Sequence, residues 1–216
     1  MAMAITLGAG GGLALVAYGF AEHPHASLLS VAAAAAILLG YGAFGLRLKR
    51  LRSSVDLRTA SVAGLAAGAV FAAEILLEYV CLPPNNVVWG YIEFGAVFLI
   101  YALAAAWVAS NRRTIGGAVG VAIVAAVISS LLWCLVLLLA FYAYEGTSAQ
   151  AAVLIAEGEP EDFLRSGMSD YRTFLIEDLY GATFFHLLLG PMLAALIGLI
   201  SSSLMLALTR LLRRAN

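Results

Sequence analysis

The chain has 216 residues, of which 63 % are hydrophobic and 12 % are charged, and its mean hydropathy is +0.97. Water-soluble domains do not normally reach such values, so the composition excludes an ordinary soluble enzyme or binding domain and indicates an integral membrane protein. The formal net charge of −1 gives no indication of nucleic acid as a partner. Neither Cys81 nor Cys134 belongs to a CxxC pattern, so we expect two unpaired thiols.

A run of about 20 mostly apolar residues is long enough to cross the hydrocarbon core of a bilayer. By this criterion the sequence predicts an all-α bundle of six transmembrane helices, arranged as three in-out-in hairpins in a single transmembrane domain of residues 1–216. The predicted spans are residues 5–20, 27–46, 59–82, 87–110, 115–142 and 180–208. Only AEHPHA separates the first two spans and only PPNN the third and fourth, which predicts tight antiparallel turns.

The basic residues predict the orientation of these spans. They concentrate in the connections after the second and fourth spans and at the C-terminus. This set comprises Arg47, Lys49, Arg50, Arg52, Arg58, Arg112, Arg113, Arg210, Arg213 and Arg214. Because short cytoplasmic segments are rich in Lys and Arg, we expect this side, with both termini, to be cytoplasmic. The basic asymmetry and the many alanines and glycines favour a bacterial inner membrane.

The long connection between the fifth and sixth spans, residues 145–179, is acidic and is expected on the outer side. Apolar residues at 151–155 form a short patch in this connection. Pro160 is a good helix start and Gly167 a plausible stop. Ser169 then reads as the N-cap of a second helix that ends near Leu179. The pattern predicts either amphipathic helices lying on the outer surface or a lid over a site in the bundle.

Small residues spaced four apart occur near the start of three spans. The pairs are Gly8 with Gly12, Gly64 with Gly68, and Gly116 with Gly120. Such pairs let helix backbones approach closely, so we expect them to lie in helix–helix contacts.

Four ionisable residues lie inside predicted spans, all in the outer half: Glu74, Glu78, Glu93 and His186. A charge placed inside a bilayer costs roughly 3 kcal/mol or more, so such residues usually face a bundle interior or a cavity. Three different spans supply them at similar depth, which predicts one shared site for a ligand, an ion or a proton.

Pro191 and Gly190 are expected to break the sixth span beside this site. A proline inside a helix leaves the carbonyl four residues earlier, here that of Leu187, without its usual partner. We therefore expect a bend that exposes backbone oxygen near His186.

The chemistry of the cluster leaves several alternatives open. Glu74 and Glu78 share a helix face, and two close carboxylates could hold a proton, a divalent metal or an ammonium group, or accept a hydrogen bond from His186. Each residue also has a purely structural alternative. Glu78 could reach water at the membrane interface, and Glu93 could pair with Arg165 or Arg172. His186 could be an ordinary core residue. Standard signatures such as HExxH, GxSxG and the Walker loop are absent from the sequence.

Three functions follow as hypotheses. The first is a transporter or permeation subunit for a proton, a metal ion or a cationic small solute. The second is a non-catalytic accessory subunit of a membrane complex, with a membrane protein or a second copy of the chain as its partner. The third is an intramembrane enzyme that acts on a lipid or quinone, with a divalent metal held by Glu74, Glu78, Glu93 and His186. Only the third requires a cofactor.

Overall fold

A computed structural model describes residues 1–48, 55–81 and 86–215 of the chain. Lys49, Arg50, Arg52 and most of the predicted PPNN turn lie outside these residues, as do the side chains of Arg213 and Arg214.

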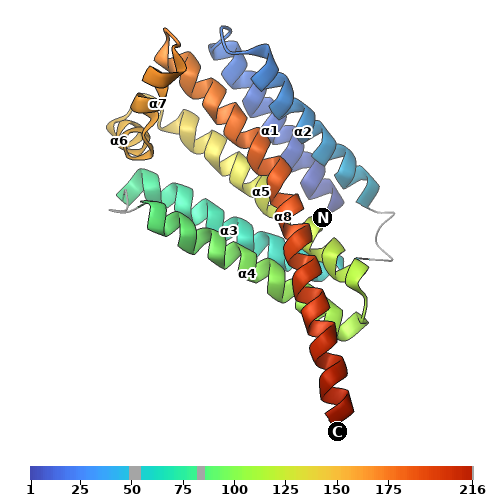
Figure 1. Ribbon diagram of the computed structural model, residues 1–216. Coiled ribbons are helices and arrows are strands. Elements are labelled where there is room, and N and C mark those ends of the chain that lie inside the picture. The colour runs from blue at the N-terminus through green and yellow to red at the C-terminus, as the bar shows by residue number, and fades with distance from the viewer. Residues whose placement is uncertain (49–54, 82–85, 216) are drawn as a thin grey trace.

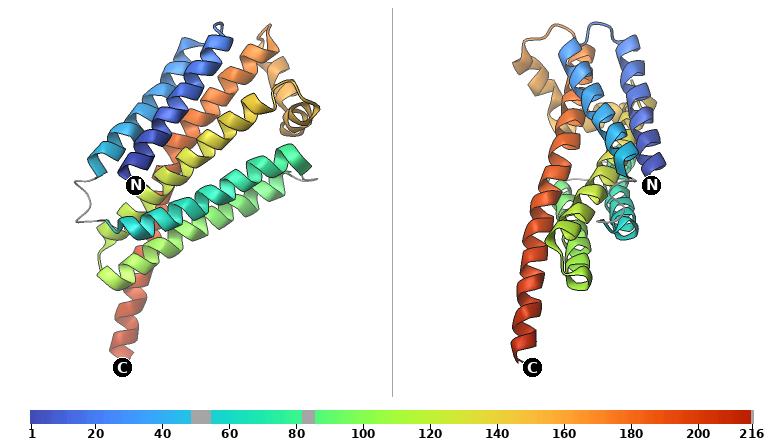
Figure 2. Two further views of the ribbon diagram at one scale, coloured as in Figure 1. Left: turned by 180° about the vertical axis from the view of Figure 1, so that it is seen from behind. Right: turned by 90° about the vertical axis from the view of Figure 1, so that its right-hand side faces the viewer.

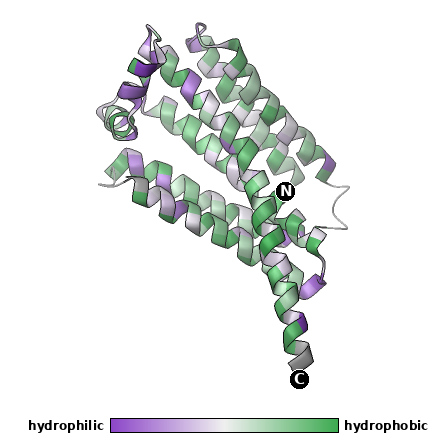
Figure 3. Ribbon diagram, in the orientation of Figure 1, coloured by the Kyte–Doolittle hydropathy of each residue, from purple (hydrophilic) through white to green (hydrophobic). Residues whose placement is uncertain are grey.

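Every regular element in the described ranges is a helix (Figure 1). The helices are α1 (Ala2–Glu22), α2 (Leu28–Arg47), α3 (Leu57–Cys81), α4 (Asn86–Arg112), α5 (Ile115–Ala143), α6 (Ser148–Glu157), α7 (Glu159–Ser166) and α8 (Tyr171–Ala215). Six of them, all except α6 and α7, are long and apolar enough to cross a membrane. Apolar residues cover these six helices, whereas polar residues gather at α7 and at the helix tips (Figure 3). The protein is therefore a polytopic helical membrane protein, as its composition predicted.

Helix α5 is the centre of the bundle. It packs against α1, α3, α4 and α8, and 61 % of the residues in its most apolar segment are buried inside the protein. A helix that is hydrophobic all round suits such a buried position. Helices α1 and α2 lie side by side on one flank of α5, and α3 and α4 lie side by side on the other (Figures 1 and 2).

The two ends of the bundle differ in charge. We call the end that carries α6 and α7 the acidic end, because it holds most of the Asp and Glu residues. The opposite end, with Arg47, Arg58 and Arg112, is the basic end. Arg112 there forms an ion pair with Asp56 at 3.2 Å.

The glycine pair of α3 lies in a close contact between α3 and α5. A Cβ atom on Gly64 would lie 2.7 Å from the carbonyl oxygen of Ala125, and one on Gly68 would lie 2.5 Å from a methyl carbon of Leu132. This pair therefore acts as predicted. Gly116 differs, because a Cβ there would meet nothing within 4 Å.

Helix α8 is longer than the predicted sixth span. The sequence predicted a separate helix from Ser169 to Leu179, but the structure has one helix of 45 residues from Tyr171 to Ala215. No glycine or proline separates Ser169 from Gly181, so nothing in that stretch ends the helix. The residue that caps it is Asp170 rather than Ser169, since the carboxylate of Asp170 accepts a hydrogen bond from the Thr173 amide at 2.9 Å. The C-terminal part of α8 extends beyond the other helices (Figures 1 and 2).

Helix α8 continues through Gly190 and Pro191 rather than ending there, and its ribbon changes direction partway along its length (Figure 1). The Tyr41 hydroxyl of α2 donates a hydrogen bond to the Leu187 carbonyl at 2.5 Å. A neighbouring helix thus satisfies the carbonyl that the proline leaves without a partner. Gly190 instead makes room for α5, since a Cβ there would lie 2.6 Å from Ser130 Oγ.

Candidate functional site

Helix α6 is fixed against the acidic ends of α3 and α5. Val153 is 3 % exposed and packs with Ile75, Tyr79 and Ala140. The Gln150 side chain is buried; its amide nitrogen donates to the Phe141 carbonyl at 3.1 Å, and its oxygen accepts from the Gly146 amide at 2.9 Å. Helix α6 is therefore docked on the bundle rather than lying free at the surface.

A cavity of about 170 Å³ lies beneath α6 and α7. Four carboxylates from four helices line it: Glu78 of α3, Glu157 of α6, Glu159 of α7 and Asp178 of α8. The rest of the wall is mainly apolar and includes Trp133, Leu137 and Phe141 of α5. We call this space the acidic cavity.

Two more carboxylates extend the cluster into the bundle. Glu74 lies one turn before Glu78 on α3, within hydrogen-bonding reach of it, and Glu93 of α4 acts on Glu74 electrostatically. Glu78 acts in the same way on Glu93. The structure therefore brings together the three predicted glutamates of the two helices α3 and α4.

Glu93 is the most buried of these acids. Its side chain is 8 % exposed, and its Oε1 atom has no hydrogen-bond partner among the described residues. The suggested pairing with Arg165 or Arg172 is wrong, because Arg165 pairs with Asp162 at 2.6 Å and Arg172 pairs with Glu145. Burial of an unpaired carboxylate oxygen is costly, so the structure offers no simple structural reason for Glu93.

Glu157 of α6 and Glu159 of α7 have raised pKa values. The pKa of Glu157 is raised to about 7, first by burial and then by repulsion from Glu78, Glu159 and Asp178. The pKa of Glu159 is also raised to about 7, first by burial and then by repulsion from Asp178 and Asp162. Although Glu157 is exposed to solvent on one side, protein atoms of the cavity wall surround it on the other. Both groups therefore change protonation near neutral pH.

A second cavity, of about 350 Å³, lies deeper along α8 and is lined mainly by aromatic side chains. We call it the aromatic pocket. His186 stands in its wall and stacks on Trp133, with ring centroids 3.8 Å apart and an interplanar angle of 7°. Phe71 of α3 meets the same imidazole edge-on at 5.0 Å. His186 thus belongs to this pocket, next to the carboxylate cluster rather than within the acidic cavity.

Three helices carry the same order of side chains along the faces that meet here. On α3 the order is Glu78, Glu74, Phe71, and on α8 it is Asp178, Ala182, His186. On α4, Glu93 precedes Val97 and Tyr101 of the aromatic pocket. Spacings of three and four residues place each set on one helix face. Acids therefore occupy the acidic end of each face, and apolar or aromatic groups follow toward the middle of the bundle.

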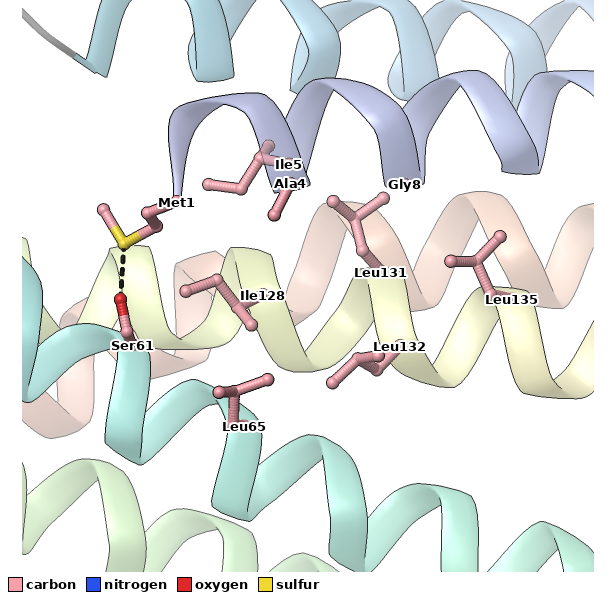
Figure 4. Close-up of a pocket in the computed structure, with 10 residues that line it drawn as sticks. All are labelled: Met1, Ala4, Ile5, Gly8, Ser61, Leu65, Ile128, Leu131, Leu132 and Leu135. Carbon is pink, nitrogen blue, oxygen red and sulfur yellow. Dashed lines mark hydrogen bonds between the residues drawn. The ribbon is translucent and has the colours of Figure 1, made fainter.

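A further cavity of about 300 Å³ lies between α1, α3 and α5, and it differs in character (Figure 4). Aliphatic side chains such as Leu65, Leu131 and Leu135 line it, and its polar contact is a hydrogen bond from Ser61 Oγ to Met1 Sδ at 2.7 Å. None of the described residues in its wall has an ionisable side chain. It therefore has none of the groups that mark the acidic cavity.

The predicted metal ligands do not form an evident metal site. Within the described ranges, no group of three or more His, Cys, Asp or Glu side chains has an arrangement that could hold a metal ion. Cys81 and Cys134 are both free thiols, as predicted.

Sequence reasoning did not identify Glu157, Glu159 and Asp178 as site residues. The acidic composition of residues 145–179 was visible, but it fits a solvated surface as well as a cavity wall. The signal that could have separated the two is the pair of apolar residues Val153 and Leu154, which buries one side of α6 and brings Glu157 next to α3.

Searches against models of known protein families, curated proteins and solved structures found no match. The fold and the cavities thus define a class, a polytopic helical membrane protein with a carboxylate-lined cavity at one end of its bundle.

Proposed function

We propose that this protein is a transporter or permeation subunit that takes up a proton or a small cationic solute through the acidic cavity. One observation carries the proposal: four helices each contribute a carboxylate to a single cavity, and no Lys or Arg among the described residues lines it. A cavity lined by one sign of charge concentrates ions of the opposite sign.

The deeper carboxylates supply a route inward. Glu78 lines the cavity, and Glu74 and Glu93 interact with it from farther inside. Chains of acidic groups inside membrane helices are typical of proton and ion pathways. A purely structural role for these positions would be costly, because an oxygen of the buried Glu93 has no hydrogen-bond partner in the part of the chain that the structure describes.

The proposal includes an orientation. The acidic end faces the outside of the cell and both termini are cytoplasmic, as the positive-inside rule requires for the basic end. In this orientation, which suits a bacterial inner membrane, the cavity opens to the exterior and α6 and α7 form its cover.

Flux measurements in proteoliposomes test the proposal. The wild-type protein should carry protons or an organic cation down an imposed gradient, and Glu78→Gln and Glu93→Gln should each reduce the flux at least tenfold. Glu161→Gln is a matched control, since Glu161 is an exposed acid on α7 that lines neither cavity. Equal flux in all four proteins, or no flux above empty liposomes, contradicts the transport function and favours an accessory role.

A further inference from the structure

The acidic cavity and the aromatic pocket adjoin each other and share part of their walls. Trp133 of α5 and Ala182 of α8 line both spaces. The first space carries four carboxylates, whereas the second carries Phe71, Phe94 and Phe98 around Trp133 and His186. A molecule that occupied both would meet negative charge at one end and aromatic faces at the other.

The aromatic pocket borders the surface that faces the lipid. Phe94 on α4 is 43 % exposed and Phe185 on α8 is 58 % exposed, and both lie in the pocket wall. An apolar group dissolved in the bilayer would therefore meet Phe94 and Phe185 at the edge of the pocket. At the same time its polar end would lie near the acidic end of the bundle, where we place the membrane interface.

Three buried polar atoms around these spaces lack hydrogen-bond partners in the described part of the chain. Glu93 Oε1 lies in the carboxylate cluster, Glu159 Oε2 belongs to the wall of the acidic cavity, and Ser130 Oγ belongs to the wall of the aromatic pocket. Buried polar atoms normally have partners. A bound cation with N–H groups or a positive field would satisfy the Glu93 oxygen.

We infer that the two spaces together bind an amphipathic ammonium compound, a molecule with one cationic amine and one aromatic or aliphatic body. The ammonium group lies among Glu78, Glu74 and Glu93, and the apolar body lies against Phe71 and Trp133. Aromatic faces also attract cations directly, so the boundary between the two spaces suits the carbon atoms next to the charge. The inference rests on the proposed function, because it names the class of cation that the transport site accepts.

Trp133 provides a binding signal that does not depend on transport. The chain has three tryptophans, and the other two, Trp89 and Trp107, are 49 % and 64 % exposed. The double variant W89F/W107F in lipid nanodiscs leaves Trp133 as the single fluorescent tryptophan. The probe is 2-phenylethylammonium, and the matched neutral probe is 2-phenylethanol, which has the same aromatic body without the charge.

We expect a saturable change in Trp133 fluorescence with 2-phenylethylammonium and at least tenfold weaker binding of 2-phenylethanol. Glu93→Gln in the same background should weaken binding of the cation about tenfold, in line with the loss of one charged partner. Glu161→Gln should not change it. If Glu93→Gln does not fold, Phe94→Leu, at a half-exposed position of the pocket, should weaken binding of the aromatic probe instead.

Equal binding of the two probes, or no saturable signal with the cation, overturns the inference. Proton flux that depends on Glu78 but is accompanied by no binding of 2-phenylethylammonium would leave the transport function standing and remove the ligand class. Saturable binding of 2-phenylethylammonium without any flux would support the ligand class and contradict the transport function.

Discussion

Tyr41 shows how a single residue adapts the bundle to a proline inside a helix. Its hydroxyl donates to the Leu187 carbonyl, the group that Pro191 deprives of its normal partner. The bond joins α2 to α8 at a buried position, since the Tyr41 side chain is 6 % exposed. One side chain thus provides a partner for the carbonyl that the proline leaves free, and α8 continues through a residue that usually interrupts a helix.

Tyr41→Phe is expected to destabilise the protein by about 1 kcal/mol, because it removes this bond and leaves a buried carbonyl unpaired. Unfolding in mixed micelles, followed by circular dichroism, measures the change. Tyr91→Phe is the control, because Tyr91 is 76 % exposed and should show no loss. A Tyr41→Phe protein as stable as that control would contradict the role assigned to the bond.

For single residues, the sequence allowed us to predict which charged side chains lie inside the membrane spans. It did not allow us to predict which side chains contact one another. The glutamates at 74, 78 and 93 stood out because carboxylates are rare in apolar spans. The partner of Leu187 could not be predicted, since Tyr41 is 146 residues away in the chain. His186 lies beside an indole rather than in the carboxylate cavity, a difference of about one helical turn that spacing alone does not resolve.

Among the elements, α6 and α7 join the surface of the protein to its interior. They contribute Glu157 and Glu159 to the acidic cavity, and Gln150 and Val153 fix them on the bundle. They therefore form part of the wall of the acidic cavity.

The docking of α6 and α7 should weaken as the pH rises through about 7. The pKa values of Glu157 and Glu159 are raised in the docked state, so that state binds more protons than the undocked one, in which ordinary carboxyl values apply. Docking is then most favourable below the ordinary carboxyl range and loses stability between about pH 4.5 and 7. Exposure of Glu157 to solvent will reduce its share.

Hydrogen exchange of the α6 amides, corrected for intrinsic rates, measures this effect. Protection should be lower at pH 8 than at pH 5.5 in the wild type. The double variant E157Q/E159Q should show nearly equal protection at both values, whereas Glu161→Gln should behave as the wild type. Protection that rises with pH, or a pH effect that survives in E157Q/E159Q, would exclude these two groups as its origin.

The close contact between α3 and α5 requires a residue without a side chain at position 64. Gly64→Ala should cost about 1–3 kcal/mol, because its Cβ would press against backbone atoms of Ala125 that cannot rotate away. Gly10→Ala on α1 is a matched change with nothing within 4 Å, and it should be neutral or stabilising by up to about 1 kcal/mol through helix propensity. Thermal unfolding in the same detergent compares them, and equal midpoints for the two variants would refute the close contact.

The existence of the long helices followed from apolar length, whereas their ends and continuity did not. A membrane span is predicted from about 20 consecutive apolar residues, and the part of α8 around Gly198 meets this criterion. The helix also includes the polar residues Glu177 and Asp178, which the criterion does not cover. Helices α6 and α7 determine which face of this polar stretch is turned toward the bundle. The sequence of α8 alone therefore could not predict that Asp178 lines the cavity.

For the molecule as a whole, orientation decides which compartment the cavity serves. Cys81 provides a natural reporter, because it lies exposed at the acidic end of α3 while Cys134 is buried in α5. A membrane-impermeant maleimide added to intact cells should label the wild-type protein and not Cys81→Ser. Labelling that appears only after the membrane is opened would place the acidic end in the cytoplasm and reverse the proposed direction of access.

We propose that the carboxylates at the acidic end form a cation site rather than a structural network. Charge movement in a reconstituted supported membrane, after a rapid step in proton or 2-phenylethylammonium concentration on the acidic side, tests it most directly. The wild-type protein should give a transient current that Glu78→Gln and Glu93→Gln abolish without loss of thermal stability, while Glu161→Gln retains it. Currents of equal size in all these proteins, or variants that lose stability in place of current, would contradict the claim.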